Sequence, residues 1–394
     1  MTKALSTRAV RAGIDIDASF GAVVPPLVLS ANFSFEAFDR KRRYDYSRSG
    51  NPTRDQLGDA LASLEGGAGA VVTATGIAAI ALVIHTLLKP GDRLLIPHDC
   101  YGGSWRLFTA LAAKGAFDLD TCDLTDVVAM QAAIERKPTL VWVETPSNPL
   151  LRITDIAAVS ALAKAVGALV VVDNTFLSPA LQCPIEHGAD IVIHSTTKYI
   201  NGHSDVVGGA AIARDAALLE QLAWWGNALG VTASPFDCYM TLRGLRTLPA
   251  RLAIQQQNCA AIAEFLLDTC EVRTVHYPAL PDHPGNSIAA RQQRGAGAML
   301  SFELAGGEKS VKAFVEGLTC FTLAESLGAV ESLVAHPATM THAAMSEEAR
   351  VRAGIAPGLL RLSVGLEHLD DLLADIEGGL GRVSACLKDV VDER

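Results

Sequence analysis

Two residues at the ends of consecutive apolar segments have the types and spacing needed to bind a reactive cofactor. Asp173 ends the segment VVVD, and Lys198 follows 25 positions later in HSTTKY. A lysine amine can form an imine with an aldehyde, and a carboxylate can keep a heteroaromatic nitrogen protonated. Alone, each residue has an ordinary structural explanation, as a surface lysine or as a hydrogen-bond acceptor at a strand end. Together they predict a site for pyridoxal 5′-phosphate.

Two further pairs of residues have the properties needed to bind a phosphate. Gly76 and Ile77 stand where an apolar segment gives way to a helix, and Ser195 and Thr197 place two hydroxyls beside Lys198. The first N–H groups of a helix are free to bind an anion, and the helix dipole adds to the attraction. A glycine turn and hydroxyls at a strand end are singly more often structural, so the prediction depends on their grouping.

Five short apolar segments carry these polar residues at their carboxyl ends. They are rich in Val, Leu and Ile, as in strands buried on both faces, and helical segments such as 155–167 separate them. This alternation predicts an α/β fold with a mostly parallel sheet flanked by helices, where ligands bind beyond the carboxyl ends of the strands. The predicted strands are 70–76, 93–99, 139–146, 168–174 and 190–196.

The length of the chain indicates more than one packed unit, since 394 residues and 41.5 kDa exceed what one hydrophobic core usually organises. Residues 1–48 carry few helical signals and are predicted to form an extended N-terminal arm. Residues 49–256 are predicted to be the cofactor-binding α/β domain. Residues 257–394 are predicted to be a smaller α+β domain, with a helix starting at 255 and strands at 298–304 and 359–365.

Composition excludes several classes of function. The formal net charge of −10 argues against a nucleic-acid partner, and the uncharged segment 66–88 contains too many glycines and threonines for a membrane helix. Eight scattered cysteines without CxxC spacing, and a start without a secretory pattern, predict reduced thiols in a cytoplasmic protein. The spacings of a dinucleotide fingerprint, a nucleophile elbow and an HExxH zinc site are missing, so we expect no metal.

Several motifs in order along the chain resemble those of one family, the fold-type I pyridoxal phosphate enzymes of cysteine and methionine metabolism. The resemblance covers nearly the whole sequence. Within the family, the segments 98–104, 223–232 and 337–343 are most similar to the bacterial members that form cystathionine. The motifs lie at 44–57, 74–76, 98–108, 144–153, 171–179, 194–209, 242–248, 321–333 and 360–367.

The resemblance implies a role for each residue of the predicted cofactor site. Lys198 would bind the cofactor covalently, Asp173 would pair with its ring nitrogen, and Tyr101 would stack on the ring, which makes these three the candidate catalytic residues. The phosphate would be bound by Gly76, Ile77, Ser195 and Thr197, joined by Tyr46 and Arg48 from a neighbouring subunit's arm. Family members are commonly homotetramers, so we expect active sites shared between subunits.

The resemblance also implies the residues that bind the amino-acid substrate. Arg361 would receive the α-carboxylate, with Ser326 and Asn148 helping to orient it. Glu325 indicates chemistry at the γ-carbon, because β-lyases of the family have an aromatic residue at this position. Side chains expected to face the leaving group are those of Asp45, Arg106 and Ser49, the last replacing an arginine that is common in the cystathionine-forming members.

The activity that follows is γ-replacement in methionine biosynthesis, forming L-cystathionine and succinate from O-succinyl-L-homoserine and L-cysteine. Two alternatives within the family stay open, γ-elimination of cystathionine and sulfhydrylation of O-acetylhomoserine. Methionine γ-lyase activity is disfavoured, because those enzymes usually have cysteine in place of Gly103. An alternative from another class is a noncatalytic metabolite-binding protein, against which the presence of Lys198 argues.

Overall fold

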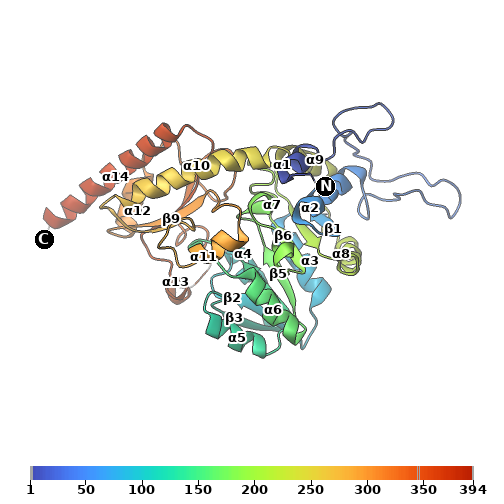
Figure 1. Ribbon diagram of the computed structural model, residues 1–394, viewed down its shortest axis with the longest axis horizontal. Helices are drawn as coiled ribbons and strands as arrows, with labels where there is room; N and C mark the ends of the chain where they lie inside the picture. The colour runs from blue at the N-terminus through green and yellow to red at the C-terminus, as the bar shows by residue number, and fades with distance from the viewer. Residues whose placement is uncertain (1–2, 344, 346, 393–394) are drawn as a thin grey trace.

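The computed structural model describes residues 3–343, 345 and 347–392. Over these residues the chain forms a seven-stranded sheet and a five-stranded sheet, each packed against helices (Figure 1). This confirms the predicted α/β fold with a second, smaller sheet.

The larger sheet has the strand order β1-β7-β6-β5-β4-β2-β3. The strand β7 runs antiparallel to both of its neighbours, and the other pairings are parallel. Each of the five strands predicted in this region is present. The strands are β1 (Gly69–Thr73), β2 (Arg93–Pro97), β3 (Asp118–Cys122), β4 (Leu140–Glu144), β5 (Leu169–Asp173), β6 (Ile191–His194) and β7 (Gly209–Ala213).

Helices cover both faces of this sheet. The side chains of α3, α4 and α8 pack on one face, and those of α5 and α6 pack on the other. Helix α6 lies within the predicted segment 155–167: the Asp155 carboxylate accepts a hydrogen bond from Ala158 N at its start, and Gly167 ends it with a left-handed φ of 81°. The helices of this part are α2 (Pro52–Glu65), α3 (Gly76–Leu87), α4 (Gly102–Ala113), α5 (Val127–Glu135), α6 (Ile156–Val166), α7 (Ser178–Leu181), the 3₁₀ helix η1 (Pro184–His187), α8 (Ala216–Leu229) and α9 (Pro235–Leu245).

The smaller sheet has the order β10-β11-β12-β9-β8 and lies against α10, α12 and α14. In β12, Leu360 and Leu362 belong to the hydrophobic core, so the alternation of side chains along a strand directs Arg361 to the opposite face. The strands are β8 (Val272–His276), β9 (Met299–Leu304), β10 (Thr322–Leu323), β11 (Leu333–Ala335) and β12 (Leu359–Ser363). The helices are α10 (Leu248–Leu267), α11 (Asn286–Gln292), α12 (Glu308–Val315), α13 (Glu347–Ala353) and α14 (Leu369–Asp392).

Helix α10 joins the two parts of the molecule. It begins at Leu248, seven residues before the predicted helix start at 255, and it packs against β8 and β9. The expected division between residues 256 and 257 therefore falls inside a continuous helix, and the domain limits stay a prediction.

The N-terminal segment contains the short helix α1 (Leu5–Val10), which packs on α2 and α10. The sequence pattern did not indicate this helix. From about residue 15 to 50 the chain forms loops that project from one end of the molecule (Figure 1), and the side chains of Phe20 and Phe38 are almost completely exposed. The uncharged segment 66–88 forms β1 and α3, and none of the helices in the described ranges is long and apolar enough to cross a membrane.

Candidate active site

One cavity of about 450 Å³ lies beyond the carboxyl ends of β4, β5 and β6 and extends to the smaller sheet. Its wall is completed by the N-terminal ends of α3 and α4 and by residues next to β10 and on β12. The predicted residues that line it are Gly76, Ile77, Tyr101, Arg106, Asn148, Asp173, Ser195, Thr197, Lys198, Glu325, Ser326 and Arg361. Residues from both sheets therefore meet in one site.

Lys198 lies in the turn that follows β6, with its amine inside the cavity. Its Nζ donates a hydrogen bond to Ser326 Oγ over 2.7 Å. Burial and the positive charge of Arg361 together lower the pKa of Lys198 to about 8, with Glu325 opposing the change. A substantial fraction of this amine is consequently neutral near physiological pH, which is the form that acts as nucleophile or base.

Asp173 is the last residue of β5, and its partly buried carboxyl group lines the cavity. Burial raises the pKa of Asp173, while hydrogen bonds from Thr175 and the charge of His194 oppose this rise. The backbone N–H of Thr175 donates to Asp173 Oδ1 over 2.9 Å. Asp173 has no ion-pair partner among the residues that the structure describes, so a protonated ring nitrogen would supply the missing positive charge.

The N-terminal end of α3 approaches the end of β6 closely enough to require a glycine. A Cβ atom on Gly76 would lie 2.8 Å from Ser195 Cβ and 3.0 Å from Ser195 Oγ. The Thr75 hydroxyl caps the helix by accepting a hydrogen bond from Ala78 N over 2.9 Å. Thr197 Oγ1 donates to Gly208 O and accepts from Gly208 N, over 3.2 and 3.0 Å. The N-terminus of α3 thus lies against Ser195, and Thr197 lines the same cavity; the anion site expected at these residues stays a prediction.

Tyr101 stands at the start of α4 and is held by a buried carboxyl group. Its backbone N–H donates to Glu144 Oε2 over 2.7 Å, and Trp142 Nε1 donates to Glu144 Oε1 over 3.1 Å. Burial and the nearby Asp173 raise the pKa of Glu144 to about 8. A Cβ atom on Gly103 would lie 2.5 Å from Cε1 of the Tyr101 ring, so a cysteine at Gly103 would force this ring to move.

Arg361 extends from β12 into the cavity with its guanidinium group buried. Its Nη1 donates to Asn148 Oδ1 and its Nη2 to Ser326 O, each over 2.8 Å. Burial lowers the pKa of Arg361 to about 10. Ser326 has a left-handed φ of 87°, which is uncommon for a residue with a side chain, and it contacts Lys198 through its hydroxyl and Arg361 through its carbonyl.

Four residues expected in the site, Asp45, Tyr46, Arg48 and Ser49, do not line the cavity of their own chain. The segment that carries them is anchored: Arg54 Nη2 donates to Arg48 O over 3.3 Å, and Thr232 Oγ1 donates to the same oxygen over 3.2 Å. The Asp45 carboxylate accepts hydrogen bonds from Tyr46 N over 2.7 Å and from Ser49 Oγ over 2.9 Å. The expected roles of Tyr46 and Arg48 in a neighbouring subunit's site, and of Asp45 and Ser49 near the leaving group, stay predictions.

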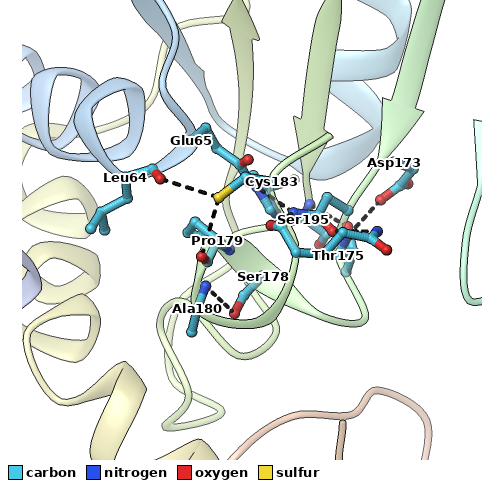
Figure 2. A network of polar contacts seen from close by, with 12 residues as sticks. Leu64, Glu65, Asp173, Thr175, Ser178, Pro179, Ala180, Cys183 and Ser195 are labelled. Carbon is cyan, nitrogen blue, oxygen red and sulfur yellow. Dashed lines mark hydrogen bonds and ion pairs between the residues drawn. The ribbon is translucent and has the colours of Figure 1, made fainter. Parts of the chain in front are cut away.

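Several lining residues were not among the predicted site residues, and two of them, Thr175 and Glu144, form hydrogen bonds to predicted ones. Thr175 bonds to Asp173 through its N–H and accepts a hydrogen bond from Ser195 N at Oγ1 over 2.9 Å, and thus bridges β5 and β6 (Figure 2). Glu144 lies at the end of β4, within the predicted strand 139–146. The position of Thr175, two residues beyond a predicted strand that ends in a site aspartate, is the signal from which it could have been found.

The fold and the cavity together define an enzyme that depends on pyridoxal phosphate. The family of Cys/Met metabolism PLP-dependent enzymes matches residues 6–381, and the chain belongs to this family. The residues present fit the cofactor, since one cavity combines the Asp173 carboxyl group, the Lys198 amine and a helix N-terminus whose close approach to Ser195 a Cβ on Gly76 would prevent. Within the described ranges, no group of His, Cys, Asp and Glu side chains could hold a metal ion.

Individual relatives include synthases and lyases. The chain is 56% identical to the cystathionine gamma-synthase of Escherichia coli strain K12, over 96% of this chain and 98% of the relative. It is 44% identical to the cystathionine gamma-lyase of Dictyostelium discoideum, with coverage of 96% and 98%. The crystal structure of cystathionine gamma synthase from Xanthomonas oryzae pv. oryzae in complex with aminoacrylate and cysteine has a TM-score of 0.97 and 64% identity, covering 98% of this chain and 100% of that chain.

Proposed function

We propose that this enzyme catalyses γ-replacement, forming L-cystathionine and succinate from O-succinyl-L-homoserine and L-cysteine. The bond from Cγ to the succinyl oxygen breaks, a bond from Cγ to the cysteine sulfur forms, and the thiol proton leaves with the products. The observation that carries the proposal is the meeting of Lys198, Asp173 and Arg361 in one cavity, with Glu325 beside the lysine. The synthases from E. coli and X. oryzae support the assignment through their high identity over the whole chain.

Each group of residues has a defined task in this proposal. Bound pyridoxal 5′-phosphate supplies an electron sink for the negative charge that develops on the substrate carbon. Asp173 holds the ring nitrogen protonated, while Gly76, Ile77, Ser195 and Thr197 bind the phosphate. Lys198 Nζ accepts the proton from the substrate Cα and then from Cβ; a base held in position in this way contributes roughly 10²- to 10⁴-fold in rate.

The substrate carboxylate would bind to Arg361. A planar guanidinium group can bind a carboxylate through two parallel hydrogen bonds. The hydrogen bonds to Asn148 and Ser326 fix the plane of the Arg361 guanidinium group. Tyr101 would stack on the cofactor ring. Arg106 would face the leaving group within the chain's own cavity. Glu325 would raise the pKa of the Lys198 amine, which acts as the base in the chemistry at the γ-carbon.

Product analysis tests the proposed activity. Purified enzyme is supplied with succinylated or acetylated homoserine, each with and without cysteine, and separately with cystathionine. The proposal predicts cystathionine and succinate as the fastest products. Faster release of 2-oxobutanoate from cystathionine would instead assign a γ-lyase, and a preference for the acetylated donor with sulfide would assign a sulfhydrylase. A Lys198→Ala variant that keeps full turnover would contradict the mechanism.

We also propose that the enzyme is a homotetramer in which the arm, residues 1–48, completes a neighbouring subunit's site. Support comes from the exposed Phe20 and Phe38 on the projecting loops, and from the position of Tyr46 and Arg48 outside their own cavity. Residues 49–256 would form the cofactor domain and residues 257–394 the smaller domain, connected through α10. A cytoplasmic location is supported by the eight cysteines, all unpaired within the described residues.

Mixing two inactive variants tests the shared site. Arg48→Ala would damage the neighbour's site, and Lys198→Ala would damage the variant's own site. In a mixed dimer one site carries both changes and the other carries neither, so random reassociation should restore about a quarter of the sites. Absence of any restored activity, with subunit exchange verified by mass, would contradict sharing.

A further inference from the structure

A buried polar cluster lies next to the candidate active site without lining its cavity. It consists of Glu65, His194 and Asn174, which have no exposed surface. Glu65 is the last residue of α2, His194 ends β6, and Asn174 directly follows β5. Of this cluster, Figure 2 labels Glu65, which lies beside Cys183.

One oxygen of Glu65 holds the ends of both cofactor-binding strands. Glu65 Oε1 lies 2.6 Å from His194 Nε2 and accepts a hydrogen bond from Asn174 Nδ2 over 2.8 Å. Asn174 is the neighbour of Asp173 in the chain, and His194 is the neighbour of Ser195. A shift of either strand end relative to the other would stretch at least one of these two contacts.

The cavity side of the same strand ends carries a second connection. Thr175 contacts Asp173 through its N–H and Ser195 through Oγ1. Glu65 and Thr175 therefore fix the same two strand ends from different sides. In the proposed site, Asp173 pairs with the ring nitrogen and Ser195 binds the phosphate. The distance between Asp173 and Ser195 therefore has to match the distance between these two groups of one cofactor molecule.

The position of Glu65 is an unfavourable one for a carboxylate. It is fully buried, it ends a helix whose dipole disfavours negative charge there, and its Oε2 has no hydrogen-bond partner in the described part of the chain. Apolar side chains fill comparable buried positions at lower free energy. What Glu65 contributes is therefore best explained by the two groups that its other oxygen holds.

We propose that Glu65 is a positioning residue for the cofactor site, which sets the separation between Asp173 and Ser195 through Asn174 and His194. The proposal rests on the assignment of pyridoxal 5′-phosphate to the cavity. Supporting it, the charge of His194 opposes the rise that burial causes in the pKa of Asp173, so the cluster and the ring-nitrogen carboxylate are also electrostatically connected.

Two cofactor forms distinguish positioning from a general structural role. Apoprotein of the wild type and of Glu65→Leu is titrated with pyridoxal 5′-phosphate and with pyridoxal, which lacks the phosphate. We expect Glu65→Leu to weaken binding of the phosphate form about tenfold, equivalent to about 1.4 kcal/mol. Binding of pyridoxal should change less, because it does not need both strand ends at a fixed distance. Glu65→Gln should have an intermediate effect, because its amide oxygen can still accept from Asn174.

Leu61→Ala is the matched control, since Leu61 is buried on the same helix and belongs to the hydrophobic core. It should lower the melting temperature while leaving the ratio of the two affinities unchanged. Glu65 variants that fold and keep the wild-type ratio would overturn the proposal. If Glu65→Leu does not fold, the ratio of the two cofactor affinities is measured for Glu65→Gln and Asn174→Leu instead. A changed ratio supports the proposal, and the wild-type ratio overturns it. Failure of the wild type to bind pyridoxal 5′-phosphate would instead contradict the assigned cofactor.

Discussion

The amine of Lys198 should react as a neutral nucleophile at a pH where an ordinary lysine is almost fully protonated. The lowered pKa of about 8 results mainly from burial, with a further contribution from Arg361. In the apoprotein at pH 7, about one Lys198 in ten should be neutral, compared with roughly one in three thousand for an amine with the usual pKa near 10.5.

Competitive acetylation measures this difference. Trace acetic anhydride is added to apoprotein over a pH series, with N-acetyl-lysine amide as an internal reference, and the Lys198 peptide is quantified by mass spectrometry. Labelling of Lys198 should rise about tenfold from pH 7 to 9 and then level off, while that of the reference amine should rise about a hundredfold and continue.

The two charged neighbours should move the midpoint in opposite directions. Arg361→Met removes the cation that lowers the pKa of Lys198, so the midpoint should move to higher pH. Glu325→Gln removes the anion that raises the pKa of Lys198, so the midpoint should move to lower pH. A wild-type midpoint near 10, or shifts of both variants in the same direction, would refute the electrostatic reasoning.

Three further changes test the assigned roles. Arg361→Ala should lower kcat/KM about 100-fold, since each charge-assisted hydrogen bond to a carboxylate contributes about 1.5–3 kcal/mol; steady-state kinetics with a melting curve checks this, and an unchanged KM and kcat would contradict it. Asp173→Asn should lower kcat by roughly 10²-fold or more, because a neutral amide cannot hold the ring nitrogen protonated; kinetics and the absorbance of the bound cofactor report the loss, and full activity would exclude this role. Lys198→Met should stabilise the apoprotein at pH 7 by about 3 kcal/mol, since the buried ammonium no longer has to be accommodated. The unfolded lysine binds more protons than the folded one between pH 8 and about 10.5, so the gain should shrink over this window; denaturant unfolding at pH 7 and 10.5 measures it, and equal stability of both proteins at pH 7 would contradict the prediction.

The strands that carry the cofactor site could be predicted because they are long apolar runs that end in polar residues. Two strands of the same sheet were missed for physical reasons. The strand β3 (DLDTC) lies at the sheet edge, where polar side chains remain partly exposed, and β7 (GAAIA) is buried but made of small residues with little strand preference.

The contacts between distant segments were beyond the reach of sequence patterns. Nothing near Ser326 indicates that its backbone adopts a left-handed conformation, or that it contacts both Lys198 and Arg361. Glu144 appears in the sequence only as the end of a strand, whereas its role in holding Tyr101 depends on the start of α4 lying beside β4. Family resemblance supplied the expected roles of Arg361 and Glu325, which periodicity alone could not.

The site combines residues from two consecutive parts of the chain, which could be exchanged separately between relatives. Lys198 and Asp173 come from the larger sheet, whereas the residues near the substrate carboxylate, Arg361 and Ser326, come from the segment after α10. A chimaera that joins the first half of this chain to the C-terminal half of a lyase relative would keep the same cofactor machinery and exchange the surface that reads the amino acid. Because Arg106, which would face the leaving group, stays in the first half, such grafts, made within α10, would test the balance between replacement and elimination and leave donor selectivity unchanged.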